Sequence, residues 1–222
     1  QERLFLQIVY ECLEDAGYTP QKLSEQGKVG VYVGAMNGYY SGGISLWSIA
    51  NRVSYLFDFH GPSFAVDSAC SSSMTALCLA VQSIQRKDCE SAIVGGVNLV
   101  VSPKHFIRLC NMRMLSPGNA CRAFGEHADG IVDGEGVGAV LIKPLKSAID
   151  NGDHIYGVIK ASELNSGGKT NGYTIPNPKY QAEVIRNAYQ KANINPETLS
   201  YIEAYGTGTA LGDPIEIEAI SK

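Results

Sequence analysis

The chain has 222 residues, of which 45% are hydrophobic and 18% are charged, and its formal net charge is −4. This composition predicts a globular chain that buries a sizeable core, and it excludes an intrinsically disordered one. The negative charge without a dense basic run argues against a nucleic-acid partner, and the lack of an apolar run of ~20 residues argues against a membrane partner.

The six cysteines form neither a C-x-x-C pair nor the cysteine and histidine spacing of a zinc site. We therefore expect no metal site and interpret the cysteines as reduced thiols of a cytoplasmic protein. We also expect no secretory signal peptide. Because it begins at Gln1 without a methionine and ends at Lys222 inside a helical pattern, we expect residues 1–222 to be part of a larger domain that extends at both ends.

Apolar periodicity predicts alternating helices and strands in the first half of the chain. The expected elements are a helix over residues 4–16, a strand over 28–34, a helix over 47–57, a strand over 63–66, a helix over 74–84 and a strand over 92–101. Gly17 stands where a left-handed residue would end the first helix. The glycine-rich loop from Gly34 to Gly43 lacks the lysine of a phosphate-binding loop. From Ser102 to Arg122 we expect an irregular stretch.

The second half continues the alternation, which favours an α/β fold. The expected elements are a bulged strand pair over residues 128–141, a strand over 155–163, a helix over 180–192 and a strand over 200–204. Asn195 and Pro196 suit the N-cap and the first position of a helix. Asp213 and Pro214 suit the same two positions of a later helix, and Glu216 would complete its capping box.

Residues 66–77, with the sequence VDSACSSSMTAL, place Cys70 where a strand turns into a helix. The first amides of a helix lack internal partners and carry partial positive charge, which favours a thiolate over a thiol. A cysteine is most often a small buried apolar residue, and we interpret Cys78 on the apolar face of this helix in that way. The turn favours the opposite interpretation of Cys70, as a catalytic nucleophile.

Residues 205–209 (YGTGT) form a second candidate stretch, because flanking glycines would leave the hydroxyls of Thr207 and Thr209 free to reach a ligand. The four histidines have no comparable context, and we expect them to be structural or solvent-facing. They are His60, His105, His127 and His154.

An ordered series of short motifs runs along the whole chain. It consists of DSACSSS at residues 67–73, GGVN at 95–98, MLSP at 114–117, CRAF at 121–124, ADG at 128–130, GEGVG at 134–138 and the stretch at 203–216. This series resembles the β-ketoacyl synthase (ketosynthase) domains of modular polyketide synthases, which belong to the thiolase-like superfamily. NSGGKTNGYT at residues 165–174 resembles the trans-acyltransferase type, which often has histidine at the position of Ser166.

The resemblance implies a layered αβαβα thiolase fold of two related halves, of which this chain contains the first half and the start of the second. It implies that Cys70 takes an acyl chain from an acyl carrier protein, and that Thr207 and Thr209 line the tunnel for its phosphopantetheine arm. The domain itself would bind no cofactor. Other polyketide synthase domains and a second copy in a homodimer are the further partners implied.

Tyr205 departs from the family pattern. Elongating ketosynthases have a histidine there, one of two that polarise the malonyl thioester and assist the loss of CO2. The motif of the second lies beyond residue 222. A phenol stays neutral at neutral pH and cannot form an imidazolium. Decarboxylative Claisen condensation is the default reaction of the family, whereas Tyr205 predicts a variant that passes acyl chains on without elongating them.

Two other functions are open. A non-catalytic docking or dimerisation domain could present the carrier protein to neighbouring enzymes, although such a domain needs no nucleophile at Cys70. A CoA-using thiolase is the alternative enzyme class, and the GTGT stretch at residues 206–209 favours carrier-protein substrates over CoA.

Overall fold

The computed structural model describes residues 1–36 and 45–222, which form two compact units. The first unit contains the described residues within 1–102 and 134–158, and the second contains residues 103–133 and 159–222. The chain therefore leaves the first unit after Ser102, returns to it at Gly134 and leaves it again after Val158. Gly38, Gly42 and Gly43 of the predicted glycine-rich loop lie outside the described residues.

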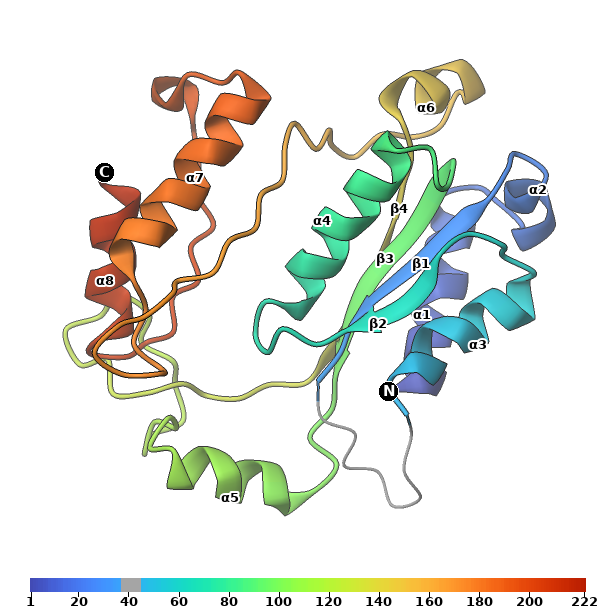
Figure 1. Cartoon of the computed structure of the whole chain (residues 1–222). Helices are drawn as coiled ribbons and strands as arrows, with labels where there is room; N and C mark the ends of the chain where they lie inside the picture. Colours follow the sequence, from blue (N-terminus) through green and yellow to red (C-terminus); the bar gives the residue numbers. More distant parts are fainter. Residues whose placement is uncertain (37–44) are drawn as a thin grey trace. The chain divides into compact units, whose positions relative to one another are not determined.

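A four-stranded sheet forms the centre of the first unit (Figure 1). Its strands are β1 (Val29–Gly34), β2 (Ser63–Val66), β3 (Ser91–Asn98) and β4 (Gly136–Ile142). They lie in the order β2-β1-β3-β4, with β1 parallel to both β2 and β3, and β4 antiparallel to β3. All of β1 is buried, as expected for a parallel strand that is covered on both faces.

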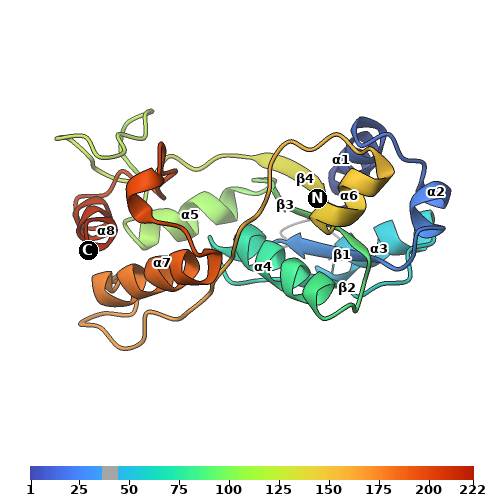
Figure 2. The same cartoon turned by 90° about the horizontal axis from the view of Figure 1, so that it is seen from above.

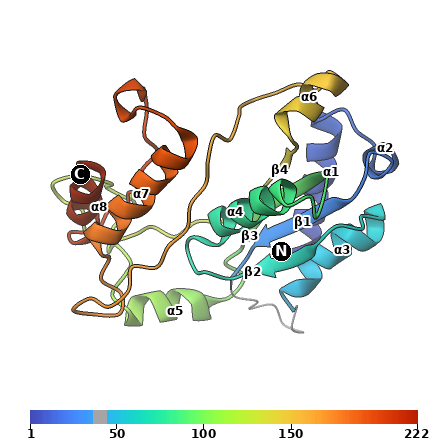
Figure 3. The ribbon, with the colours of Figure 1, turned by 45° about the horizontal axis from the view of Figure 1, so that its top comes forward.

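Helices cover both faces of this sheet (Figure 3). The helices of the first unit are α1 (Glu2–Asp15), α2 (Pro20–Ser24), α3 (Trp47–Phe57), α4 (Ser72–Gln85) and α6 (Leu145–Asn151). Side chains alternate between the two faces of a strand. Val31 and Val33 of β1 accordingly pack in one core with α1 and α3, whereas Tyr32 packs in a second core with α4. The first unit is thus a three-layer α/β structure.

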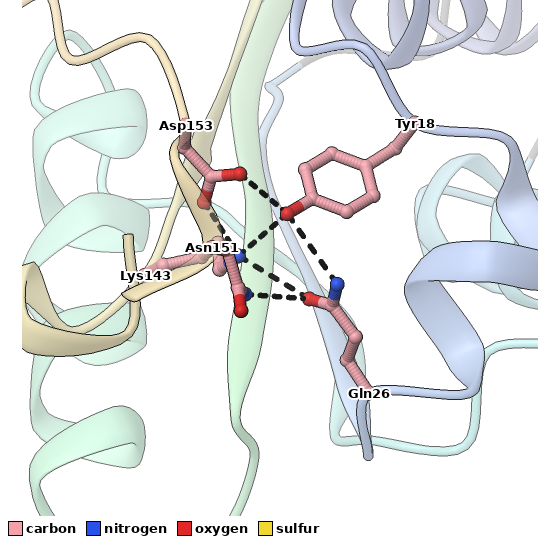
Figure 4. Close-up of polar contacts among 5 residues, drawn as sticks. All are labelled: Tyr18, Gln26, Lys143, Asn151 and Asp153. Atoms are coloured by element: carbon pink, nitrogen blue, oxygen red, sulfur yellow. Dashed lines mark hydrogen bonds and ion pairs between the residues drawn. The ribbon is translucent and has the colours of Figure 1, made fainter. Parts of the chain in front are cut away.

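The first helix ends as predicted, with Gly17 at a φ of +74°. The Gly17 N–H donates to the Glu14 carbonyl at 3.0 Å, and the Tyr18 N–H donates to the Leu13 carbonyl at 2.9 Å. These two bonds form a Schellman ending. The ending turns the chain so that the side chain of Tyr18 points toward the end of β4 (Figure 4).

Tyr18 belongs to a polar cluster that also contains Lys143 and Asp153 (Figure 4). Lys143 Nζ donates to Asp153 Oδ2 at 2.6 Å and to Tyr18 Oη at 2.8 Å, and Tyr18 Oη donates to Asp153 Oδ1 at 2.5 Å. Gln26 bonds to Tyr18 and Lys143, and Asn151 donates to Gln26. The cluster therefore connects segments that are more than a hundred residues apart in sequence.

The named elements of the second unit are helices. Its helices are α5 (Pro103–Asn111), α7 (Pro178–Ala192), the 3-10 helix η1 (Pro196–Thr198) and α8 (Gly212–Ile220). α7 and α8 pack side by side (Figures 1 and 2). Asn195 accepts a hydrogen bond from the Glu197 N–H at 3.1 Å, as predicted for an N-cap, although the helix that follows is only a 3-10 turn. Across residues 1–36 and 45–222, no helix is long and apolar enough to cross a membrane.

The prediction that residues Ser102 to Arg122 are irregular is wrong, because this stretch contains α5. Ser102 and Pro103 are themselves a helix-start signal. The buried residue of α5 is His105 rather than an apolar one, so the helix lacks the buried apolar stripe on which the prediction relied.

Several strand predictions also fail. The strand over residues 92–101 ends at Asn98, and the bulged pair over 128–141 is the single strand β4 together with an isolated bridge between Leu115 and Ile131. The segments 155–163 and 200–204 join no sheet within the described residues. A strand depends on a paired neighbour, which a local apolar pattern does not report.

Candidate active site

The turn between β2 and α4 (Figure 1) carries Cys70, as the sequence predicts. Its side chain is exposed. Ser71 is the N-cap of α4, so Cys70 directly precedes the helix. Ala69 has a φ of +55°, a left-handed conformation that residues other than glycine rarely adopt. A sharp turn therefore presents this thiol at the N-terminal end of a helix.

Side chains within the turn bond to its own peptide groups. Asp67 Oδ1 accepts from the Ala69 N–H at 3.0 Å, and Ser71 Oγ donates to the Ser68 carbonyl at 2.9 Å. Ser72 Oγ accepts from the Ser68 N–H at 3.0 Å and donates to the Ala69 carbonyl at 2.5 Å. A left-handed residue other than glycine costs about 1–3 kcal/mol and persists only where its surroundings fix it. These four hydrogen bonds fix Ala69.

Two glycines let α4 approach the sheet closely. Gly34 and Gly96 pair across β1 and β3 at the carboxyl end of each strand. A Cβ at Gly34 would lie 2.3 Å from the Ser73 backbone nitrogen, and a Cβ at Gly96 would lie 3.1 Å from the Ser73 Cβ. Close approach of backbone to backbone is a recognised use of glycine. The sheet therefore supports the turn that carries Cys70.

This arrangement suits nucleophilic chemistry. Unpaired amides in the first turn of a helix favour negative charge, whether on a thiolate or on an oxyanion next to it. Cys78, by contrast, is only 4% exposed on α4 and packs in the core, as predicted. Of the two cysteines near this turn, Cys70 is the accessible one.

In the second unit, two carboxylates of α8 bond to the loop over residues 205–209. Glu216 accepts from the Tyr205 N–H at 2.6 Å and from the Gly206 N–H at 2.9 Å. Asp213, which is 3% exposed, accepts from the Gly208 N–H at 3.0 Å. The path of the loop backbone is therefore set by the helix that follows it.

The predicted capping box is wrong. α8 begins at Gly212 with Leu211 as its N-cap, so Asp213 lies inside the first turn. The second oxygen of Asp213 accepts from the Phe124 N–H at 2.6 Å, across 89 residues of sequence. The Asp-x-x-Glu pattern did indicate carboxylates that bond to backbone amides. The amides, however, belong to the loop and to Phe124 and not to the start of the helix.

Thr207 and Thr209 lie side by side, with their Oγ1 atoms 2.8 Å apart. Thr207 Oγ1 donates to Asp213 Oδ1 at 3.2 Å, so Thr209 is the donor of the bond between the threonines. Thr209 Oγ1 also accepts from the Gly212 N–H at 3.0 Å. The expectation of free hydroxyls is therefore wrong: both protons are used within the loop, and lone pairs remain to accept.

A further thiol lies against the same loop. Cys121 Sγ is 3.5 Å from the Thr207 carbonyl oxygen, to which it donates, and a Cβ at Gly208 would lie 2.9 Å from this sulfur. The Gly130 N–H donates to the Gly208 carbonyl at 2.9 Å. Motifs that are far apart in sequence thus meet around Gly208, whose φ of +69° also favours glycine.

The predicted site residues fall into two groups. Tyr205, Thr207 and Thr209 share one loop of the second unit, and Cys70 belongs to the first unit. The backbone N–H of Tyr205 is bonded to Glu216, while the residue as a whole is 64% exposed. Sequence reasoning missed Asp213 and Glu216 as residues that order this loop. The sequence signal that could have identified them is a pair of carboxylates, three residues apart, directly after a glycine-rich loop.

His105 was expected to be structural or solvent-facing, and in the second unit it is buried. It is 7% exposed on α5, and its Nε2 lies 2.7 Å from Asp133 Oδ2. Asp133 is the last residue before the chain returns to the first unit. The pair therefore joins the two ends of the segment 103–133.

The three-layer first unit and its cysteine at a strand-to-helix turn define an α/β protein with a candidate thiol nucleophile. Two family models match the sequence. "Beta-ketoacyl synthase, N-terminal domain" matches residues 1–148, and "Beta-ketoacyl synthase, C-terminal domain" matches residues 156–222. The chain belongs to the β-ketoacyl synthase family.

Curated relatives are large polyketide synthases. The chain is 61% identical over 222 residues to polyketide synthase PksM of Bacillus subtilis strain 168, and 51% identical over 238 residues to polyketide synthase ThaG of Burkholderia thailandensis. Each match covers 100% of the chain, but only 5% of PksM and 4% of ThaG. The chain thus spans a small part of these relatives.

Solved ketosynthase structures are also similar over the whole chain. The oxazolomycin ketosynthase domain OzmH KS7 of Streptomyces albus JA3453 matches with a TM-score of 0.97 and 45% identity. The ketosynthase from module 6 of the bacillaene synthase of Bacillus subtilis 168 matches with a TM-score of 0.95 and 44% identity. The chain covers 40% of each of these solved chains. This similarity confirms the expected thiolase-like fold.

Proposed function

We propose that the chain is part of a polyketide synthase ketosynthase domain in which Cys70 takes up acyl chains from an acyl carrier protein. The observation that carries this proposal is the exposed Cys70 thiol on a turn fixed by four side-chain hydrogen bonds and by the sheet. A docking domain would have no use for a left-handed Ala69 that presents a thiol.

The first step forms one C–S bond and breaks another. The Cys70 thiolate attacks the carbonyl carbon of an acyl thioester, and the carbonyl oxygen becomes an oxyanion. The Cys70 N–H is the local donor for this oxyanion. When the tetrahedral intermediate collapses, the phosphopantetheine sulfur leaves and takes up the proton that Cys70 lost. The products are acyl-Cys70 and the unloaded carrier protein.

Thr207 and Thr209 would contact the phosphopantetheine arm as acceptors. Their protons are used within the loop, so each offers an oxygen lone pair to a ligand N–H. The arm contains two amide N–H groups, which match this requirement. In this proposal the domain holds no cofactor of its own, and phosphopantetheine arrives on the carrier protein.

The second step of the family is condensation. A malonyl unit loses CO2, and its enolate attacks acyl-Cys70, which releases the Cys70 thiolate and leaves a β-ketoacyl chain on the carrier. The phenol at Tyr205 stands where elongating members have a histidine, and losing one well-placed donor costs ~10²–10³ in rate. We therefore propose that this domain passes acyl chains on without elongating them.

The motif at residues 165–174 and the similarity to PksM support a polyketide synthase of the trans-acyltransferase type. Its partners would be the carrier protein, other domains of a cytoplasmic polyketide synthase and a second copy of the ketosynthase in a homodimer.

The test uses the complete ketosynthase domain that contains this chain. The domain is incubated with an acyl carrier protein thioester and then with malonyl carrier protein, and every species is followed by intact mass. We expect Cys70 to become acylated without an elongated product. Tyr205→His should raise elongation by at least ~10-fold, because it restores the missing donor. Tyr201→His, at an exposed tyrosine four residues earlier, is the matched control and should not raise elongation.

Each other outcome identifies a rival. Elongation by the native domain at the rate of the Tyr205→His variant would show that Tyr205 is a working substitute for histidine. No acylation of Cys70 would favour the docking domain. Acylation from CoA thioesters as fast as from the carrier protein would favour a thiolase.

A further inference from the structure

The buried hydroxyl of Ser72 lies inside the turn that presents Cys70. Ser72 is 5% exposed, whereas its neighbours Ser71 and Ser73 are exposed. A buried hydroxyl is normally hydrogen-bonded, and Ser72 Oγ accepts from the Ser68 N–H and donates to the Ala69 carbonyl, both in the backbone of the turn. Ser72 is therefore a structural part of the turn as well as the first residue of α4.

The Ala69 carbonyl belongs to the same peptide unit as the Cys70 N–H. That carbonyl accepts two hydrogen bonds from Ser72, one from Oγ at 2.5 Å and one from the backbone N–H at 3.1 Å. A trans peptide unit is planar, so its C=O and N–H point in opposite directions. Any group that fixes the direction of the Ala69 carbonyl also fixes the direction of the Cys70 N–H.

The conformation of Ala69 makes this restraint necessary. At a φ of +55° it occupies a region that is unfavourable for an L-residue, so the peptide after it tends to rotate away when released. A hydrogen bond to a carbonyl also polarises the peptide and strengthens its N–H as a donor. Both effects act on the amide that faces the oxyanion.

We infer that Ser72 is a positioning residue whose hydroxyl orients the Ala69–Cys70 peptide so that the Cys70 N–H stabilises the oxyanion of acylation. This inference rests on the proposed role of Cys70 as the acyl-accepting nucleophile. It predicts that loss of the hydroxyl slows reactions that form an oxyanion more than reactions that only need the thiolate.

The test compares two reactions of Cys70 in the complete domain. Acylation by an acyl N-acetylcysteamine thioester passes through an oxyanion, whereas alkylation by iodoacetamide displaces iodide from a saturated carbon and forms none. In Ser72→Ala we expect acylation to slow by ~10- to 100-fold, because the oxyanion donor is misoriented. Alkylation should stay within about threefold of the native rate.

Ser71→Ala is the matched control. Ser71 is exposed and bonds to the Ser68 carbonyl, one peptide earlier, where water can replace its hydroxyl. Because Ser71→Ala leaves both bonds of the Ala69 carbonyl in place, the ratio of acylation to alkylation should stay within about threefold of the native ratio, even if both rates fall together. Ser72→Thr keeps the hydroxyl and should keep the native ratio of acylation to alkylation. It also allows a test if Ser72→Ala does not fold.

Three results would overturn the inference. They are native acylation in Ser72→Ala, an equal fall of both rates in that variant, and selective loss of acylation in a folded Ser72→Thr domain that alkylates normally. Failure of the proposed function is separate from these, because it would appear as the absence of acylation in the native domain.

Discussion

A single carboxylate, that of Asp213, orders the loop that carries three of the four predicted site residues. Its two oxygens accept from the Gly208 N–H, from the Thr207 hydroxyl and from the Phe124 N–H. Because the residue is 3% exposed, water has little access to replace these bonds. Asp213 thus sets the direction of the threonine hydroxyls.

We expect Asp213→Ala to lower the free energy of unfolding of the complete domain by about 2–3 kcal/mol, because buried amides lose a charged acceptor. Urea unfolding measures this loss. Glu218→Ala is the control, since Glu218 lies on the same helix in an exposed pair with Lys222, and it should cost less than about 0.5 kcal/mol. Equal, small effects of the two changes would contradict the role assigned to Asp213.

At the scale of elements, the packing of α4 on the sheet places Cys70. The N-terminal turn of α4 lies against the carboxyl ends of β1 and β3, and the missing side chain of Gly34 makes the contact possible. The nucleophile therefore depends on a helix–strand contact and not only on the motif around it.

Gly34→Ala should disturb this contact, because its Cβ would lie 2.3 Å from the Ser73 nitrogen, which is backbone and cannot rotate away. We expect a loss of about 1–3 kcal/mol in unfolding free energy and slower alkylation of Cys70. Gly138→Ala on β4, where a Cβ would meet nothing within 4 Å, should change stability by less than about 0.5 kcal/mol. A Gly34→Ala domain as stable and as reactive as the native one would show that α4 can shift without cost.

Prediction of the elements succeeded where the signal is local. The strand–turn–helix around Cys70, α1 with its Gly17 ending, α3 and α7 all follow from periodicity and terminal residues. α5 was missed because its buried residue is a histidine. The strands expected over residues 155–163 and 200–204 were wrong because pairing, and not pattern, decides a strand.

At the scale of the whole molecule, polar contacts join segments that are far apart in the sequence. In the first unit, Tyr18 bonds to Lys143 and Asp153, which form an ion pair whose side chains are 8% and 13% exposed. Burial opposes the charge of Asp153, but hydrogen bonds from Lys143 and Tyr18 outweigh it and lower the Asp153 pKa. Burial likewise opposes the charge of Lys143, but bonds with Asp153 and Tyr18 outweigh it and raise the Lys143 pKa.

These shifts predict a pH dependence of stability. The contribution of Asp153 is complete above its unfolded pKa of about 3.9 and is lost as the pH falls through its lower folded pKa. The contribution of Lys143 is complete below about 10.4 and is lost as the pH rises through its higher folded pKa. The pair therefore stabilises the fold most between about pH 4 and pH 10.

Asp153→Asn should lower the unfolding free energy by about 2–3 kcal/mol at pH 7, because it leaves the shielded Lys143 ammonium without its counter-charge. The difference in unfolding free energy between the native domain and the variant should narrow below about pH 4, because the unfolded native chain takes up a proton at Asp153 there, before the folded domain does. Thermal unfolding of the complete domain across this range measures both effects. Asp150→Asn, in an exposed pair with Lys146, is the control and should show neither the loss of unfolding free energy nor its pH dependence. A gap that does not change with pH would contradict the ion pair.

The local chemistry of this protein can be read from the order of its residues: a cysteine between a strand and a helix, a glycine-rich loop with two threonines, and a tyrosine in place of a motif histidine. These follow from neighbouring residues, whose periodicity and turn preferences are written in the order of the chain. Tertiary structure alone decided which groups those residues bond to. It directed Asp213 and Glu216 to the loop instead of a helix cap, engaged both threonine protons, and brought Cys121 and Gly130 to Gly208. The physical reason is that a hydrogen bond depends on distance in space, and residues about ninety positions apart become neighbours only when the chain has folded.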